Sequence, residues 1–260
     1  MKLPFLDTVL WAAGPVLNAA LVAVMCLRRR LRTFPVLASW CIFTILSAIA
    51  HFFAYRLGSD RVYAFVYWIA EGLDALFQIG VVIEVARAVF QPLGSPLRKS
   101  RLWITSLIGG CVLISFAIVR WIHPAALTQA GVWEIRGEIF TSLVIGGMFT
   151  LVLIESQRLG LHWRSHVMSI GYGLMVWVAV TLIIGLLHGY WGTHLHYLQV
   201  EHVRMAVYLS ILGYWIVALW RDEPQKGSLS PEIHDAILQV ADRVSYDLAE
   251  VLGTREKESH

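Results

Sequence analysis

Apolar segments recur along the chain and are separated by short polar or basic stretches. Each segment reaches the length of about 20 residues that an α-helix needs to cross a bilayer. The predicted spans are 3–27, 35–55, 62–90, 102–122, 137–156, 167–188 and 198–220. The pattern therefore predicts an all-α fold, in which residues 1–222 form a bundle of seven transmembrane helices.

The third predicted span, 62–90, differs from the others because it carries polar side chains within its apolar run. Glu71, Asp74 and Gln78 are spaced i, i+3 and i+7, so they project from one face of a helix. A carboxylate at membrane depth costs at least a few kcal/mol unless it is paired or protonated. We therefore expect other helices to cover this face.

Basic residues concentrate in alternate connections between the predicted spans and after the last span. In chain order they are Arg28, Arg29, Arg30 and Arg32, then Arg98, Lys99 and Arg101, then Arg158 and Arg164, and finally Arg221 and Lys226. Connections rich in lysine and arginine face the cytoplasm in multi-pass membrane proteins. This places the N-terminus outside and the C-terminus in the cytoplasm. The predicted location is the cytoplasmic (inner) membrane, with the lipid bilayer as the first partner.

Residues 223–260 form a predicted cytoplasmic tail, in which an amphipathic helix covers about 231–252. Its apolar positions recur every three or four residues, at Ile233, Ile237, Val240, Val244, Leu248 and Val251. Such a helix either lies on the membrane or under the bundle, or docks a cytoplasmic protein partner or a second copy of the chain as a homodimer.

Composition agrees with a membrane protein and excludes several classes. Hydrophobic residues make up 57% of the chain and charged residues 15%, whereas a soluble domain of this length has about a quarter charged residues. A formal charge of +3 is too small to indicate nucleic acid, so no nucleic-acid partner is expected. The three cysteines lack CxxC spacing and are expected to be buried packing residues.

Two stretches of this chain are similar to a known family. They are YWIAEGLDALFQIGVVIEVARAVF, which a basic loop follows, and RLGLHWRSHVMSIGYGL. The chain resembles a family of uncharacterised bacterial seven-helix integral membrane proteins that occur in multiple copies in some soil bacteria. This resemblance implies the seven-helix topology and supplies no activity. A vaguer likeness is to the seven-helix input regions of histidine kinases.

The outer half of the predicted bundle is rich in titratable side chains. Glu201, Arg204 and Tyr208 repeat the i, i+3, i+7 spacing of the third span. Arg204 is expected at a depth that overlaps that of Glu71, so we predict that it neutralises Glu71 or Asp74. The predicted ligand-binding residues are Glu71, Asp74, Gln78, Arg204 and Tyr208. The ion pair either fixes helix register or forms part of a pocket for a ligand or a proton.

Histidines raise the alternative of a metal site. Ser47 and His51, with Asp74, are similar to part of the pattern in ceramidase and adiponectin-receptor-like hydrolases. Those families also carry His-x-x-x-His on the last span, which this chain lacks. Candidate ligands would be His51, His188 and His202. No cofactor is predicted, and zinc remains an alternative.

The expected function is that of a non-enzymatic sensor or interaction protein, with an outer-facing polar pocket and a partner-docking tail. One alternative is an intramembrane metal-dependent hydrolase acting on lipid. A second is an ion- or proton-coupled transporter, in which Glu84 and Arg87 would extend the polar path or pair with each other near the cytoplasmic end. No Walker loop, GxGxxG or GxSxG motif is present in the sequence.

Overall fold

The computed structural model describes residues 5–90, 97–124, 128–158, 166–191 and 197–222. The chain divides into two units, Met1–Asp222 and Glu223–His260. The predicted amphipathic helix at about 231–252 belongs to the second unit and lies outside the described residues.

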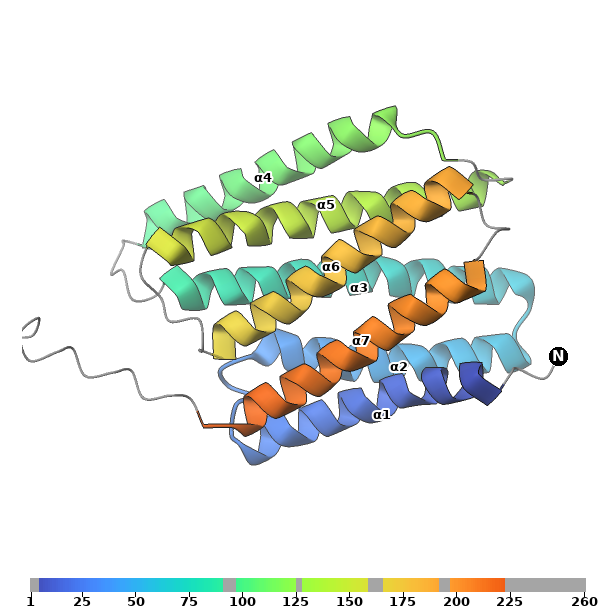
Figure 1. Ribbon diagram of the computed structural model, residues 1–260, viewed down its shortest axis with the longest axis horizontal. Coiled ribbons are helices and arrows are strands. Elements are labelled where there is room, and N and C mark those ends of the chain that lie inside the picture. Colours follow the sequence, from blue (N-terminus) through green and yellow to red (C-terminus); the bar gives the residue numbers. More distant parts are fainter. Residues whose placement is uncertain (1–4, 91–96, 125–127, 159–165, 192–196, 223–260) are drawn as a thin grey trace, which may run out of the picture. The chain divides into compact units, whose positions relative to one another are not determined.

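Helices form all the regular structure of the described residues, and no strand occurs among them, which confirms the prediction of an all-α fold. The helices are α1 (Phe5–Leu27), α2 (Pro35–Leu57), α3 (Asp60–Phe90), α4 (Leu97–Trp121), α5 (Gln129–Arg158), α6 (His166–Trp191) and α7 (Tyr197–Trp220) (Figure 1).

Five of these helices are long and apolar enough to cross a membrane, which indicates a multi-pass membrane protein. Their apolar segments are Val9–Leu27, Pro35–Leu57, Gln129–Ile154, His166–Tyr190 and Leu198–Trp220. The helix α3, which carries Glu71 and Asp74, is not among the five. The helix α4 contributes the shorter apolar stretch Ile108–Trp121.

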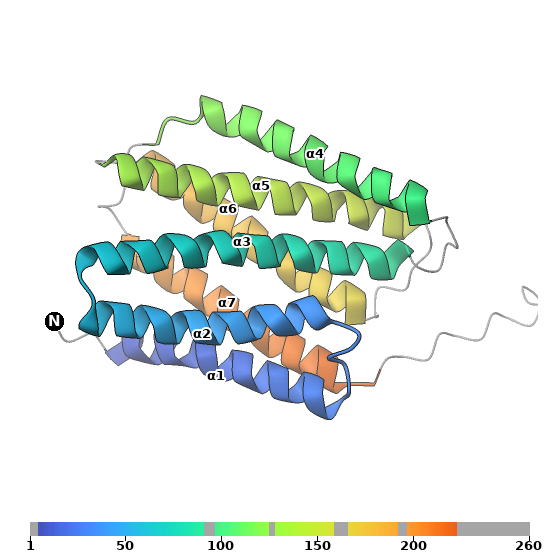
Figure 2. The same ribbon diagram turned by 180° about the vertical axis from the view of Figure 1, so that it is seen from behind.

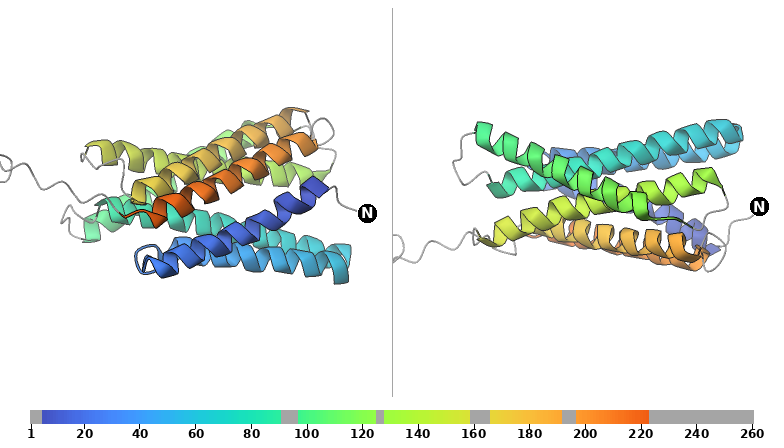
Figure 3. Two further views of the ribbon diagram at one scale, coloured as in Figure 1. Left: turned by 60° about the horizontal axis from the view of Figure 1, so that its bottom comes forward. Right: turned by 90° about the horizontal axis from the view of Figure 1, so that it is seen from above.

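The helices form a ring from which α4 is displaced. Along the ring α1 packs on α2, α2 on α3, α3 on α5 and α6, α5 on α6, α6 on α7, and α7 back on α1. The helix α4 packs on α5, and Figures 1 and 2 show it at the edge of the bundle. Figure 3 shows the same arrangement from two further sides, with α7 beside α6 and α1. Because α4 stays outside the ring, the polar face of α3 meets α5 and α6.

The helix α5 begins at Gln129, whereas the sequence predicted a loop as far as Arg136 and a helix from Gly137. Two polar side chains in this first part have partners on neighbouring elements. Glu134 accepts a hydrogen bond from the Tyr67 hydroxyl at 2.7 Å, and Arg136 donates to the carbonyl of Ile122 at 3.0 Å. Tertiary contacts thus stabilise a helical segment in a polar stretch for which the sequence pattern predicted a loop.

The main apolar core occupies one end of the bundle. Most of its buried members come from the last parts of α1, α3, α5 and α7 and the first parts of α2 and α6, while Phe34 precedes α2 and Cys111 lies on α4. The helical members include Leu21, Met25, Leu37, Val81, Val85, Phe149, Leu174, Trp215 and Leu219. Apolar burial contributes about 25 cal/mol per Å² of surface removed from contact with solvent water. We call this the core end, and the opposite end the cavity end.

Candidate functional site

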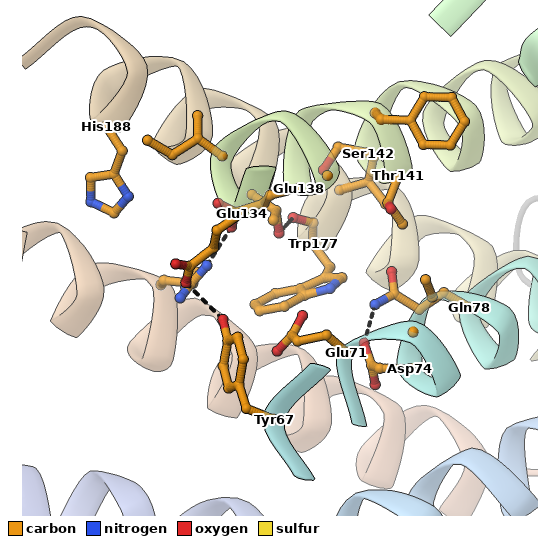
Figure 4. A pocket seen from close by; sticks show the side chains of 18 of the residues that line it. Tyr67, Glu71, Asp74, Gln78, Glu134, Glu138, Thr141, Ser142, Trp177 and His188 are labelled. Carbon is orange, nitrogen blue, oxygen red and sulfur yellow. Dashed lines mark hydrogen bonds and ion pairs between the residues drawn. The ribbon is translucent and has the colours of Figure 1, made fainter. Parts of the chain in front are cut away.

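A cavity of about 540 Å³ lies between α3, α5, α6 and α7 (Figure 4). It is at the cavity end, where α3, α5 and α7 begin and α6 finishes. Its polar lining residues are Tyr67, Glu71, Asp74, Gln78, Glu134, Glu138, Thr141, Ser142, Thr181, His188, Glu201, Arg204 and Tyr208. The five residues predicted as ligand-binding from helical spacing are all in this set.

Asp74 and Gln78 form a hydrogen-bonded unit on the α3 wall. Trp40 of α2 donates its indole N–H to Asp74 Oδ1 at 2.7 Å, and the Gln78 amide donates to Asp74 Oδ2 at 2.5 Å. Both carboxylate oxygens of Asp74 therefore accept hydrogen bonds, which compensates for the cost of taking this group out of water. Gln78 is buried.

Arg204 does not pair with Glu71 or Asp74, so that prediction was wrong. Its guanidinium instead forms an ion pair with Glu138 of α5, and a second one with Glu201 of α7 at 2.5 Å. The side chains of Arg204, Glu138 and Glu201 are 29%, 18% and 12% exposed, so these charges are only partly screened by solvent. The arginine joins α5 to α7 and forms no ion pair with the two carboxylates of the α3 wall.

Glu201 extends this network to α6. Its Oε1 lies 3.8 Å from His188 Nε2, a distance too long for a hydrogen bond. Glu201 Oε1 is buried and accepts no hydrogen bond within the described part of the chain. The residue is 9% exposed and lines the cavity, so a buried oxygen remains available there.

Glu71 has a different setting from its neighbour Asp74. Its side chain lines the cavity and is exposed to it. Among residues 5–90, 97–124, 128–158, 166–191 and 197–222, nothing forms a hydrogen bond or ion pair with its carboxylate, and Figure 4 shows it between Tyr67 and Trp177. Within the described ranges, Glu71 therefore has both carboxylate oxygens available to a ligand.

Tyr208 anchors the α7 wall. Asn18 of α1 is 2% exposed and donates its amide N–H to the Tyr208 hydroxyl at 2.8 Å. The Tyr208 ring lies 5.3 Å from the ring of Trp177 on α6. The predicted site residue Tyr208 thus has a defined orientation, and Trp177 joins it in an aromatic wall.

Residues on α5 are the main part of the site that the sequence did not reveal. Glu134 and Glu138 are spaced i, i+4, which places both on one helix face. The polar stretch before Gly137 predicts a loop, so the sequence pattern does not place Glu134 on a common helix face with Glu138.

The structure does not assemble the three histidines considered as metal ligands. His51 lies on α2, its Nδ1 is 2.7 Å from the carbonyl of Ser47, and its ring faces Tyr63 and Tyr67. His188 lines the cavity, and His202 lies on α7 outside its lining. No group of three His, Cys, Asp or Glu side chains positioned for a metal ion occurs in the described ranges.

Comparison with known proteins adds no family: no protein-family model, curated protein or solved structure matches the chain. The function is therefore inferred from the fold and the cavity. They define a multi-pass helical membrane protein with a polar, carboxylate-rich cavity between four of its helices.

Proposed function

We propose that this chain is a non-enzymatic sensor of the inner membrane that binds a small polar ligand in the cavity. The observation that carries the proposal is the convergence of polar groups from α3, α5, α6 and α7 on one space of about 540 Å³. Pockets for small molecules commonly measure 300–1,000 Å³ and combine apolar walls with a few polar groups.

In this proposal all seven helices span the membrane, with the N-terminus outside and the cavity open to the outer side. The two helices beyond the five apolar ones are long enough, because α3 has 31 residues and α4 has 25, and a helix rises about 1.5 Å per residue across a core of about 30 Å. The basic turn between α1 and α2 lies at the core end, which supports a cytoplasmic position for that end.

Cysteine labelling tests this orientation. In a chain whose native cysteines are replaced, Ser59→Cys lies in the turn between α2 and α3, and Thr33→Cys lies in the turn between α1 and α2. A membrane-impermeant maleimide should label Ser59→Cys in intact cells and Thr33→Cys only after permeabilisation. The reverse pattern would overturn the orientation and make the cavity face the cytoplasm.

The position of α7 supports a signalling function for the cavity, because this helix connects the cavity to the tail in the chain. It carries Glu201, Arg204 and Tyr208 in the cavity, and its last residues lead into the tail. At the core end, two arginines of the turn after α1 contact the end of α7 and the two residues that follow it. Arg28 lies 3.2 Å from the Asp222 carboxylate and 4.7 Å from the ring centroid of Trp220. Arg30 donates to the carbonyl of Arg221 at 3.1 Å. A ligand that shifts α7 would change what its far end presents to the tail and to a cytoplasmic partner.

The apolar core end favours a binding site over a transport path. The polar face of α3 ends at Gln78, and Val81, Val82 and Val85 after it are fully buried. Glu84, the next carboxylate along α3, accepts hydrogen bonds from the backbone of α2. The hydrolase alternative gains no support from the described residues, because they bring no three metal-ligating side chains together.

Filling the cavity tests the proposed binding function. Gly72 and Gly137 both line the cavity. A Cβ atom added at either position would have no heavy atom within 4 Å, so there is space for a larger side chain. Gly109 on α4 has equally open space around an added Cβ atom but does not line the cavity, so the same substitution there is the matched control.

We expect a thermal-shift screen of small polar compounds on the purified protein to find ligands that stabilise the wild type and Gly109→Phe. The same ligands should not stabilise Gly72→Phe or Gly137→Phe, although these variants fold. Equal stabilisation of all four proteins, or no stabilising compound at all, would overturn the cavity as the functional site.

A second experiment addresses the tail. Deletion of residues 227–260 should remove in-cell cross-links to cytoplasmic proteins and leave ligand stabilisation of the bundle unchanged. Unchanged cross-links after the deletion would overturn partner docking through the tail.

A further inference from the structure

We infer that the ligand of this cavity is an organic cation, an alkyl- or arylalkylammonium compound, and that Glu71 is its principal charge partner. This inference rests on the proposed function and specifies the chemistry of the ligand.

The first support is the charge balance of the lining. Five carboxylates, from Glu71, Asp74, Glu134, Glu138 and Glu201, line the cavity together with the guanidinium of Arg204. Two of the five already bind that guanidinium. The remaining negative charge repels an anion, and it attracts a cation more strongly in this partly enclosed space than it would in water.

The second support is the presence of acceptors without a matching donor. The Glu71 carboxylate has no hydrogen bond or ion pair with a residue that the structure describes, and it faces the cavity. Glu201 is nine-tenths buried, and its Oε1 accepts no hydrogen bond from the described residues. A protonated amine supplies both a positive charge and N–H donors to such oxygens.

Aromatic side chains give the cavity a surface suited to an organic cation. Trp177 and Tyr208 form one wall with ring centroids 5.3 Å apart, and Tyr67 and Trp68 line the α3 side. Cations within about 6 Å of an aromatic ring face are attracted by its quadrupole, and quaternary ammonium groups are bound in this way by aromatic cages.

The arrangement is poorly suited to a bare metal ion. A divalent cation needs several ligand atoms within about 2.0–2.6 Å of one point. The described residues place no three His, Cys, Asp or Glu side chains in such a group, and three of the five carboxylates are engaged with Arg204 or Tyr67. Dispersed carboxylates and aromatic walls around about 540 Å³ fit a cation with an organic body.

The test uses four probes, and the first two differ in charge at equal shape. Choline carries a trimethylammonium group, and 3,3-dimethylbutan-1-ol has the same skeleton with carbon in place of nitrogen. Benzyltrimethylammonium adds an aromatic group, and benzoate serves as the anionic probe. Binding is measured by calorimetry and thermal shift with the full-length protein in a non-ionic detergent.

We expect at least one ammonium probe to bind at about 1 mM or tighter, and choline to bind about tenfold more tightly than its uncharged counterpart. Glu71→Gln should weaken ammonium binding about tenfold. Glu84→Gln makes the same change on the same helix away from the cavity and should leave ammonium binding unchanged.

Equal binding of choline and 3,3-dimethylbutan-1-ol, or preference for benzoate, would overturn the cation inference. If neutral or anionic compounds from the wider screen bind, and Gly72→Phe blocks them while no ammonium probe binds, the inference fails and the proposed function stands. If nothing binds in either experiment, both fail. Unchanged ammonium binding in Glu71→Gln would overturn the role of Glu71.

Discussion

Two glutamates on α3 show how differently the two ends of the bundle use the same side chain. At the core end, Glu84 accepts hydrogen bonds from the backbone N–H groups of Val36 at 2.8 Å and Leu37 at 3.1 Å. These groups lie in the first turn of α2, where helical N–H groups lack intrahelical partners and where the N-cap residue, Phe34, makes no side-chain cap. At the cavity end, Glu71 lines a cavity and has no such partner in the described chain.

Two glycines in the apolar core and two in the cavity lining differ in the space around them. A Cβ added at Gly171 or Gly173 would lie 2.3 Å from Phe149 or 2.2 Å from Trp215, two fully buried rings. At Gly72 and Gly137 an added Cβ would meet nothing within 4 Å. The core is therefore close-packed around Gly171 and Gly173, while the cavity wall has room for a ligand beside Gly72 and Gly137.

The largest effect should come from the arginine of the cavity. Arg204→Met leaves the carboxylates of Glu138 and Glu201 without their cation, so we expect a loss of about 2–4 kcal/mol in the free energy of unfolding. Arg28→Met is the control at the other end: its partner Asp222 has an 89% exposed side chain, and the loss should be about 0–1 kcal/mol. Chemical unfolding in one detergent measures both. Equal losses of unfolding free energy in the two variants would show that the Arg204 ion pairs contribute no more to stability than the exposed Arg28–Asp222 pair.

Gly173→Ala tests the close packing of the core end. The added methyl group clashes with the buried Trp215 ring, and overpacking of this kind costs about 1–3 kcal/mol. Gly137→Ala makes the same change in open space at the cavity end and should stabilise its helix by about 0.5–1 kcal/mol. Thermal unfolding of the pair should give shifts of opposite sign. Shifts of the same sign would contradict the packing difference.

The two glutamates of α3 can be compared directly. Glu84→Gln keeps the shape of the side chain but weakens two charge-assisted hydrogen bonds to α2, so we expect a loss of about 1–2 kcal/mol. Glu71→Gln should change the unfolding free energy by no more than about 0.5 kcal/mol without ligand. If Glu71→Gln were the more destabilising variant, Glu71 would have a structural role and not a binding role.

The smallest effect is expected at Tyr208. Tyr208→Phe removes one of the two acceptors of the buried Asn18 amide, the other being the carbonyl of Gly14, and should cost about 1 kcal/mol because one N–H group then loses its partner. Tyr214→Phe, on the exposed side of the same helix, should stay within about 0.5 kcal/mol of the wild type. Thermal unfolding of the two variants checks this, and equal midpoints would show that the Asn18–Tyr208 bond adds no stability.

Local patterns in the sequence were sufficient for the approximate positions of the helices and for five residues of the cavity lining. Apolar runs depend on the residues of one segment, so they predicted seven helices at nearly the places where the structure has them. Spacing within a helix is also local, so Glu71, Asp74 and Gln78 were expected on one face, and all three line the cavity with Arg204 and Tyr208.

The partners of these side chains were decided only by the packing of the helices. A helical pattern defines which face is polar, but it carries no information on which neighbour that face meets. Arg204 meets Glu138 because α4 lies outside the ring and α5 occupies the place beside α3 and α6, so that Glu138 reaches across the cavity to the arginine of α7. Glu84 meets the first turn of α2 because α3 packs against α2, and the backbone N–H groups of that turn, which lack intrahelical partners, require an acceptor.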